Sequence, residues 1–369
     1  MNQPNKFIIS GGGTGGHIFP AIAIANALKA KVENAEILFI GAEGRMEMEK
    51  VPAAGYKIIG LPIRGFDRKN MLRNVKTLFL LAKSMYKAKK IVKDFAPNAV
   101  IGVGGYASGP TLKVASQLGI PVIVQEQNSF AGVTNKLLSD KAACFCVAYE
   151  GMERFFPKEK IILTGNPIRQ YLQLDPKRKE EAYKFFNLDP AKKTLLVIGG
   201  SLGARTLNQS LLGHLETLAQ SGIQVIWQAG KIYIENLRKE SASSITKDII
   251  LTDFVARMDY AYAIADLVIS RAGASSISEL CLLGKPSILV PSPNVAEDHQ
   301  THNAMALVHK DAAVMIKDVD AKEQLVPAAL KLIEDNQQLS QLATNCLKLA
   351  EKDSAARIAD EILKRAKSN

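Results

Sequence analysis

The feature that most constrains the fold of this sequence is a repeated unit in which an apolar strand runs into a glycine-containing turn and then into a helix. In the clearest copy, the apolar run 265–269 stops at the turn 270–273, and residues 275–279 supply serines of the kind that start helices. Residues 99–124 form a second copy, with the same Leu-Gly-x-Pro before the next strand. This repetition predicts two similar α/β domains in tandem, each built on a parallel sheet.

Each turn of this kind creates a place for an anion. The first N–H groups of a helix have no partner inside the helix, and the positive end of the helix dipole lies there. A phosphate or pyrophosphate can therefore bind without a metal. In the helix after residue 273, Glu279 could also accept hydrogen bonds from a ribose diol. For this stretch alone, an ordinary turn with a solvated glutamate is the alternative.

Chain length and local sequence place a domain boundary near residue 168. A chain of 369 residues exceeds what one hydrophobic core usually organises, so two domains are expected. A Pro/Gly turn at 164–168 precedes the charged run 175–181, which fits domains 1–168 and 169–349. The remaining tail, about residues 350–369, has a helical pattern and is long enough to pack back on the first domain.

Composition restricts the class of protein. Hydrophobic residues at 47% and charged residues at 22% are typical of a globular chain, and no run of about 18 apolar residues could span a bilayer. The first residues pass into a strand without the anatomy of a signal peptide, so we expect a cytoplasmic protein. Cys144, Cys146, Cys281 and Cys346 are predicted to be core residues and not metal or redox groups.

Positive charge is concentrated in the first domain. Residues 1–168 hold 22 Lys and Arg against 12 Asp and Glu, whereas the rest of the chain holds 25 against 24. Residues 64–93 contain ten basic residues and one acid, interleaved with apolar residues at helical spacing. Unless its apolar stripe faces the core, such a helix favours an anionic membrane surface as partner, and not nucleic acid. The predicted membrane contacts are Met71, Leu72, Val75, Leu78 and Phe79.

The first glycine turn also matches a dinucleotide-binding pattern. Gly11, Gly13 and Gly16 satisfy G-x-G-x-x-G, and Glu43 follows the next strand, where an NAD-dependent enzyme would bind a ribose. A helical pattern follows over 19–30, with Pro20 in its first turn. However, Gly12 and Gly15 give the loop more glycine than the dinucleotide pattern requires, and His17 stands at its mouth. These two features favour a different ligand.

A polar cluster follows another buried strand. Residues 125–128, with the sequence QEQN, come directly after the apolar run 122–124. Open α/β sheets bind ligands at the carboxyl ends of their strands, so we expect this cluster to contribute to binding. Arg169, the first charge after the boundary turn, would lie over any cleft between the two domains.

Two groups of residues resemble metal ligands. In the loop 292–302, His299 and His302 stand beside two acids, although a loop in this position suits sugar hydroxyls equally well. Asp318 and Asp320 resemble an acidic pair that holds a divalent ion, but they precede a helical pattern and helix capping is the preferred interpretation. We therefore predict no metal site and no cofactor.

Seven blocks of the sequence occur in an order that is typical of one enzyme family. They are GGGTGGHIFPA (11–21), VGGYASGP (103–110), EQNSFAGVTNK (126–136), GNPIR (165–169), GGSLGAR (199–205), SRAGASSISE (270–279) and DHQTHNA (298–304). Together they resemble the MurG family of glycosyltransferases, which transfer N-acetylglucosamine (GlcNAc) in bacterial cell-wall synthesis. The resemblance runs nearly end to end. It implies a GT-B fold, in which two Rossmann-like domains face each other across a cleft and the C-terminal helix returns to the first domain.

The resemblance also implies the residues that bind the donor, UDP-GlcNAc. Val255 would meet the uracil through its backbone, Glu279 would bind the ribose, and Ser201 would bind phosphate. Gln300 and Asn303 would bind the GlcNAc hydroxyls. The full implied set is Thr14, Gly15, Gly16, Asn128, Arg169, Ser201, Val255, Ala274, Ser275, Ser276, Glu279, Gln300 and Asn303.

The chemistry that the resemblance implies is an inverting transfer. The 4-hydroxyl of MurNAc in undecaprenyl-pyrophosphoryl-MurNAc-pentapeptide would attack C1 of GlcNAc and displace UDP. Oriented N–H groups would stabilise the departing pyrophosphate without a metal. His17 and Glu126 are the candidate catalytic residues, and Glu126 and Asn128 are also rivals for positioning the acceptor. The enzyme would be a peripheral protein at the cytoplasmic face of the inner membrane.

Three other functions stay open. An NAD-dependent oxidoreductase would use the glycine pattern of the first turn. A UDP-GlcNAc 2-epimerase would bind the same nucleotide but would need no lipid, and the basic apolar stretch 64–93 argues for one. A non-catalytic membrane scaffold would leave the repeated phosphate-binding turns without a purpose.

Overall fold

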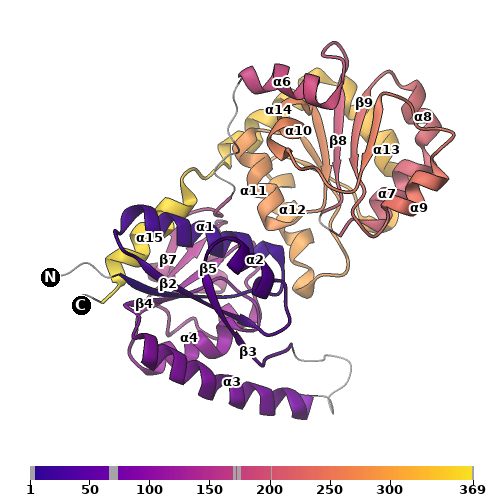
Figure 1. Ribbon diagram of the computed structural model, residues 1–369. Coiled ribbons are helices and arrows are strands. Elements are labelled where there is room, and N and C mark those ends of the chain that lie inside the picture. Colours follow the sequence, from indigo (N-terminus) through magenta and orange to yellow (C-terminus); the bar gives the residue numbers. More distant parts are fainter. Residues whose placement is uncertain (1–4, 66–73, 169–171, 173–175, 201, 368–369) are drawn as a thin grey trace. The chain divides into compact units, whose positions relative to one another are not determined.

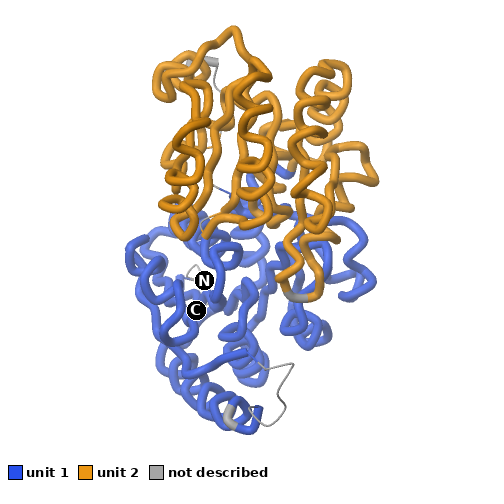
Figure 2. Tube along the Cα trace, turned by 90° about the vertical axis from the view of Figure 1, so that its right-hand side faces the viewer, with its two compact units in different colours: residues 1–168, 351–369 blue, residues 169–350 orange. Residues whose placement is uncertain are grey.

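The computed structural model describes residues 5–65, 74–168, 172, 176–200 and 202–367 (Figure 1). Four predicted site residues therefore lie outside the described residues: Met71, Leu72, Arg169 and Ser201. The chain forms two compact units, one of residues 1–168 with 351–369 and the other of residues 169–350 (Figure 2). Each unit is described separately below.

The first unit is built on a sheet of seven parallel strands, as far as the described residues go, in the order β3-β2-β1-β4-β5-β6-β7. The strands are β1 (Lys6–Ser10), β2 (Glu36–Ala42), β3 (Lys57–Leu61), β4 (Ala99–Gly102), β5 (Val122–Glu126), β6 (Cys144–Val147) and β7 (Ile161–Leu163). The helices are α1 (Gly15–Lys31), α2 (Glu47–Ala53), α3 (Asn74–Phe95), α4 (Ser108–Gln117), α5 (Val133–Lys136) and α15 (Ser354–Arg365), with short 3-10 helices at Met152–Arg154 and Lys158–Lys160. The strand order reverses between β1 and β4, where doubly wound sheets bind their ligands.

The core of the first unit lies on both faces of this sheet. On β1, Phe7 and Ile9 pack into one cluster with α1 and α15, whereas Ile8 packs into the other with α3 and α4. All three side chains are fully buried. A parallel strand covered on both faces needs a continuous apolar run, and this is why residues 6–10 read as KFIIS with no alternation.

The C-terminal helix α15 completes one of these two clusters. Ile358, Ala359 and Ile362 are fully buried in the core of the first unit, in contact with α1. Lys31 of α1 pairs with Asp360 at 2.7 Å, and a guanidinium nitrogen of Arg357 donates to the Leu163 carbonyl at 2.5 Å. The last helix is therefore part of the first unit.

The second unit repeats the topology of the first. Among its described residues, six parallel strands lie in the order β10-β9-β8-β11-β12-β13, and the order reverses between β8 and β11. The strands are β8 (Thr194–Ile198), β9 (Gln224–Gln228), β10 (Ile249–Thr252), β11 (Leu267–Ser270), β12 (Ser287–Leu289) and β13 (Val314–Met315). The helices are α6 (Pro176–Phe186), α7 (Arg205–Gly213), α8 (Leu215–Gln220), α9 (Ile234–Glu240), α10 (Met258–Ile264), α11 (Ala274–Leu283), α12 (His299–Val308), α13 (Asp318–Glu334) and α14 (Asn336–Lys348), with a 3-10 turn at Ala296–Asp298. The prediction of two similar α/β domains is confirmed.

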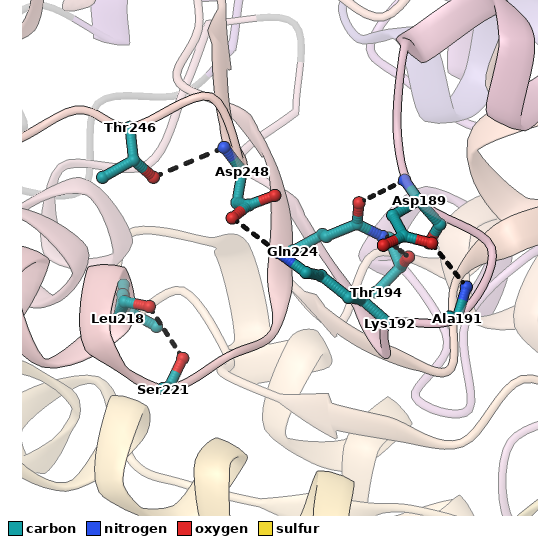
Figure 3. Close-up of polar contacts among 9 residues, drawn as sticks. All are labelled: Asp189, Ala191, Lys192, Thr194, Leu218, Ser221, Gln224, Thr246 and Asp248. Atoms are coloured by element: carbon teal, nitrogen blue, oxygen red, sulfur yellow. Dashed lines mark hydrogen bonds and ion pairs between the residues drawn. The ribbon is translucent and has the colours of Figure 1, made fainter.

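Polar side chains at the amino ends of the strands in the second unit bind one another and the backbone (Figure 3). The Gln224 amide accepts from Asp189 N at 2.6 Å and donates to Asp189 O at 2.9 Å. Lys192 donates to Asp248 at 2.8 Å. These bonds fasten the segment before β8 to the starts of β9 and β10, so this edge of the sheet has a structural role.

Two helix starts differ from the sequence-based expectation. The first helix was expected over 19–30 with Pro20 in its first turn, but α1 begins at Gly15 and Pro20 lies inside it. In α11, residues 275–279 were predicted to supply both the capping residue and the first turn. The capping position is instead Gly273, and no side chain caps it, so the serines at 275 and 276 lie in the first turn. Both helices start directly at the sheet edge because the glycine turns need few residues.

Two sequence-based predictions concern the cysteines and membrane-spanning segments. Cys144, Cys146, Cys281 and Cys346 are all free and buried, which confirms their assignment to the core. The pKa of the Cys281 thiol is raised well above its ordinary value by a hydrogen bond with Cys346 and by burial. In the part of the chain that the structure describes, no helix combines the length and apolar character needed to cross a membrane.

Replacement of Ile362 by Ala tests the place of α15. Loss of this fully buried side chain is expected to lower the free energy of unfolding of the first unit by about 2–5 kcal/mol. The single tryptophan, Trp227, is fully buried in the second unit and reports on that unit alone. In urea, the part of the circular dichroism transition that reports on the first unit should shift to lower urea concentration. The midpoint of the Trp227 fluorescence transition should stay unchanged. Lys364→Ala, on the exposed side of the same helix, is the control, and a shift of the Trp227 midpoint would contradict the assignment.

Candidate active site

The glycine loop after β1 is held from three sides. Gly11 N donates to Ile40 O of β2 at 3.2 Å, and Gly12 N donates to Gly104 O at 3.3 Å. Gly13 N donates to the Glu47 carboxylate at 2.8 Å. The loop therefore has a fixed shape at the point where the strand order reverses. The sequence-based prediction missed Glu47.

His17 lies against the turn that follows β4. Its Nδ1 is 3.0 Å from Gly12 O and 3.2 Å from the Thr14 hydroxyl oxygen. Because a carbonyl oxygen can only accept, this contact favours the tautomer with the proton on Nδ1, which leaves Nε2 as the basic nitrogen. At Gly104 a Cβ atom would lie only 2.8 Å from Nε2, so the turn needs glycine there. The loop and the turn together orient the ring.

Glu126 is the centre of a hydrogen-bond network at the end of β5. It is 2% exposed, and its oxygens accept from Asn128 N at 3.0 Å, Gly132 N at 3.0 Å and Asn135 Nδ2 at 2.8 Å. A carboxylate with these partners holds a loop in place, so we interpret Glu126 as an anchor and not as a base. Asn128, which this anchor positions, is only partly buried.

The side chains of the neighbouring residues Gln125 and Gln127 are buried and form hydrogen bonds within the protein. Gln125 donates to Asn166 Oδ1 at 3.0 Å. Asn166 in turn donates to Gln127 O at 3.0 Å. These two side chains therefore link β5 to the segment after β7, and the contribution of the cluster 125–128 to binding stays a prediction.

In the second unit, Arg271 joins three loops at the carboxyl edge of the sheet. Its Nη1 donates to Val290 O at 3.1 Å, Pro291 O at 3.2 Å and Asp318 Oδ1 at 2.5 Å. The other Asp318 oxygen accepts from the Thr206 hydroxyl at 3.0 Å. Asp318 thus pairs with Arg271 in the first turn of α13. This turn also contains Asp320, and neither carboxylate caps the helix.

The start of α11 and the residues around it form the predicted nucleotide site. Glu279 is 5% exposed and accepts from the hydroxyl of buried Tyr262 at 3.0 Å. Ala274 is buried, whereas the serines at 275 and 276 are half-buried. The N–H groups of the first turn follow directly on β11 at the reversal of strand order, as an anion site requires.

Helix α12, which follows the loop after β12, contributes amide side chains. Gln300 Oε1 accepts from Ser292 N at 2.8 Å, and Asn303 Nδ2 donates to Ala272 O at 3.3 Å. Asn303 therefore contacts the same turn that begins α11. Thr301 donates to Asp298 at 2.8 Å. Among the described residues, no three His, Cys, Asp or Glu side chains come together in a way that could hold a metal ion.

The turn after β10 places Val255 at the same edge. Val255 is buried, and beyond it Arg257 makes two hydrogen bonds to Asp259, from Nε at 2.9 Å and from Nη2 at 2.7 Å. These bonds lower the pKa of Asp259 below its ordinary value. The guanidinium group also lies over the Tyr260 ring, 3.5 Å from its centre.

Gln228 is a site residue that the sequence-based prediction missed. As the last residue of β9, it accepts from Gly200 N at 3.1 Å and donates to Gly200 O at 2.8 Å and to Asp253 O at 3.1 Å. It therefore ties the glycine turn after β8 to the turn before Val255. A polar residue ending an apolar strand was the available signal.

Helix α3 carries an exposed apolar stripe in the first unit. Val75, Leu78, Phe79 and Tyr86 are 69%, 55%, 71% and 77% exposed, at spacings that place them on one side of the helix. The opposite side is buried through residues that include Ala88 and Val92, so the apolar residues of this stretch lie both in the core and on the exposed side of the helix. Of the predicted membrane contacts, Met71 and Leu72 lie outside the described residues.

The sequence matches two domains of one enzyme family. Residues 7–147 match the glycosyltransferase family 28 N-terminal domain, and residues 194–361 match the glycosyltransferase family 28 C-terminal domain. These two matches cover the whole of the second sheet and, apart from Lys6 and β7 (Ile161–Leu163), the whole of the first.

Named relatives agree with this match. The chain is 61% identical, over 97% of its length and 98% of the relative's, to the UDP-N-acetylglucosamine--N-acetylmuramyl-(pentapeptide) pyrophosphoryl-undecaprenol N-acetylglucosamine transferase of Parabacteroides distasonis. It is 28% identical to the crystal structure of Acinetobacter baumannii MurG, with a TM-score of 0.79 over 98% of this chain and 100% of that one. A UDP-GlcNAc 2-epimerase from Neisseria meningitidis shares the fold at 14% identity, with a TM-score of 0.67 over 98% of this chain and 100% of that one.

Replacement of Arg271 by Met tests whether this side chain holds the loops together. Asp318 would lose its cation and two carbonyls would lose their donor, so we expect the free energy of unfolding of the second unit to fall by about 1–3 kcal/mol. Urea unfolding followed by Trp227 fluorescence measures this change. Arg238→Met, which removes the surface pair with Glu235, is the matched control and should change stability by less than about 0.5 kcal/mol. Equal effects of the two variants would count against the proposed role.

Proposed function

Because this chain belongs to the glycosyltransferase 28 family, we propose that it transfers GlcNAc from UDP-GlcNAc to undecaprenyl-pyrophosphoryl-MurNAc-pentapeptide in peptidoglycan synthesis. The observation that carries this proposal is the 61% identity, over almost the whole of both chains, with a transferase of that name. The fold agrees, since both units have the parallel sheets of a GT-B enzyme. The acceptor hydroxyl attacks C1 of GlcNAc, and UDP leaves with inversion.

We assign the donor to the second unit. The first turn of α11, at Ala274, Ser275 and Ser276, offers backbone N–H groups to the pyrophosphate. Glu279, oriented by Tyr262, accepts hydrogen bonds from the ribose. As UDP departs, negative charge grows on the pyrophosphate, and N–H groups that are already oriented stabilise the transition state more than the ground state.

The remaining donor contacts extend this assignment to the other loops. Val255 binds the uracil through its backbone, and Ser201 binds phosphate. Gln300 and Asn303, which already contact the turns of this edge, bind the GlcNAc hydroxyls. This arrangement uses no metal. The absence of a metal from the proposed mechanism is supported by the ion pair between Asp318 and Arg271, because Arg271 already neutralises the Asp318 carboxylate.

We assign the acceptor and the base to the first unit. His17 is the base, because the tautomer favoured by its contact with Gly12 O leaves Nε2 able to take the proton of the attacking hydroxyl. Asn128, positioned by Glu126, and the loop residues Thr14, Gly15 and Gly16 contact the substrates. Arg169 is proposed as a donor contact on the resemblance alone.

The alternative functions are less well supported. For an NAD-dependent enzyme, Glu43 should face a ribose, but its carboxylate pairs with Lys87 at 2.9 Å. The N–H of Gly13, which would face the dinucleotide phosphate, donates to Glu47. The likeness to a 2-epimerase at 14% identity supports a common fold and not a common reaction.

We further propose that the enzyme binds the anionic inner membrane peripherally, at its cytoplasmic face, through α3. The exposed side chains of Val75, Leu78 and Phe79 would enter the headgroup region, and exposed Lys83, with other lysines of the helix, would contact anionic lipids. An apolar stripe of this kind is costly in water unless a surface covers it.

Replacement of His17 by Ala tests the base. Transfer of labelled GlcNAc from UDP-GlcNAc to purified lipid acceptor should fall by about 100-fold or more, because general base catalysis is lost, while the donor KM changes little. Wild-type enzyme should remain active in EDTA. His309→Ala, a surface change of the same kind, should keep full activity. Equal turnover in His17→Ala and wild type would exclude the assignment.

Replacement of Val75, Leu78 and Phe79 together by Ser tests the membrane surface. The loss of apolar burial should weaken binding to vesicles of anionic phospholipid by about 10-fold or more in a sedimentation assay. UDP-GlcNAc binding should be unaffected, because the donor lies in the other unit. Val319→Ser, which removes an equally exposed apolar side chain from the second unit, should leave vesicle binding unchanged. Wild-type vesicle binding by the triple variant would contradict the proposal.

A further inference from the structure

We propose that Glu47 is a positioning residue that sets the orientation and tautomer of His17 through a single peptide group. This inference rests on the proposed function, in which His17 is the base. Glu47 does not reach His17 itself. It acts on the peptide group between Gly12 and Gly13, which contacts both side chains.

The Glu47 carboxylate joins two segments at the edge of the first sheet. It is the first residue of α2 and is only 1% exposed. One oxygen accepts from Gly13 N at 2.8 Å, and the other accepts from Ala42 N at 2.9 Å, at the end of β2. Both oxygens thus bind backbone N–H groups, and the start of α2 adds a favourable dipole for the negative charge.

The surrounding glycines make room for this carboxylate. A Cβ atom at Gly12 would lie 2.2 Å from the carboxyl carbon of Glu47, and one at Gly41 would lie 2.5 Å from its Cγ. Neither distance is possible for a real side chain. Gly12 is also one of the two glycines, with Gly15, that exceed the dinucleotide-binding pattern, so the buried carboxylate explains a glycine that this pattern does not require.

The peptide group between Gly12 and Gly13 connects Glu47 to His17. The C=O of Gly12 and the N–H of Gly13 belong to the same peptide plane and point in opposite directions. The N–H donates to Glu47, and the C=O lies 3.0 Å from His17 Nδ1. Fixing one end of the plane therefore fixes the other.

This peptide group would otherwise rotate easily. The plane turns through ψ of Gly12 and φ of Gly13, which is 85° here, and glycine at both positions tolerates many values of these angles. If the plane turned over, the Gly13 N–H would replace the carbonyl next to His17. An N–H beside Nδ1 favours the tautomer with the proton on Nε2, which cannot take a proton from the acceptor. Glu47 excludes this state by holding the N–H.

Glu47→Gln is the test, because it keeps the size of the side chain but replaces one accepting oxygen by an NH₂ group. We expect kcat to fall about 10-fold or more, with the donor KM within about twofold of wild type. Long-range ¹H–¹⁵N spectra of protein labelled at histidine should show the Nδ1-protonated form of His17 in the wild type and a shift toward the Nε2-protonated form in the variant. His17→Ala identifies the signal.

Two more variants complete the experiment. Glu43→Gln makes the same change at a neighbouring carboxylate that pairs with Lys87 on the surface, and it should change neither readout. Glu47→Asp keeps both oxygens but has a shorter side chain, so its kcat and its His17 tautomer population should lie between those of Glu47→Gln and wild type. If Glu47→Gln does not fold, Glu47→Asp decides the question. Unchanged kcat, or an unchanged His17 tautomer, in a folded Glu47 variant would overturn the inference. An inactive wild type would instead refute the proposed function, and the spectra would still test Glu47.

Discussion

The structure depends on the burial of parallel strands on both faces. Because helices cover each sheet from both sides, the strands must be apolar throughout, and polar side chains can gather only where strands end. The reversal of strand order then separates two neighbouring loops at one edge of each sheet. In both units the glycine turns begin helices at this point. The polar groups that serve a ligand are thus confined to a narrow edge by the same constraint that forms the core.

Much of the fold could be predicted from the sequence because of this constraint. The apolar run 122–124 lies in β5 and the run 265–269 overlaps β11, since apolar runs between turns have few other interpretations. The edge strands β3 and β13 were missed, because they are only partly buried and their apolar pattern is weak. The start of α1 was placed too late, since a glycine-rich first turn gives no helical signal.

The candidate site was less predictable, for a physical reason. Sequence patterns identified the residues on the turns, but not the side chains that hold the turns, because these come from elsewhere in the chain. Glu47 follows β2 and reaches the loop after β1, and Gln228 ends β9 but binds the turn after β8. For Glu126 the position was predicted, but its bonds favour a different role. A preorganised site needs such supports, and they are visible only once distant segments are brought together.

The membership of α15 in the first unit has a consequence for the order of folding during synthesis. Residues 169–350 are continuous in the chain, so the second unit has all of its sequence before the last helix has left the ribosome. The first unit is made earlier, but its core lacks Ile358 and Ile362 until α15 has been made. Although N-terminal domains generally fold first as a chain emerges, here the N-terminal domain must be the last to reach its complete core. Until then the apolar face of α1 stays open, and nascent chains are exposed to aggregation through that face.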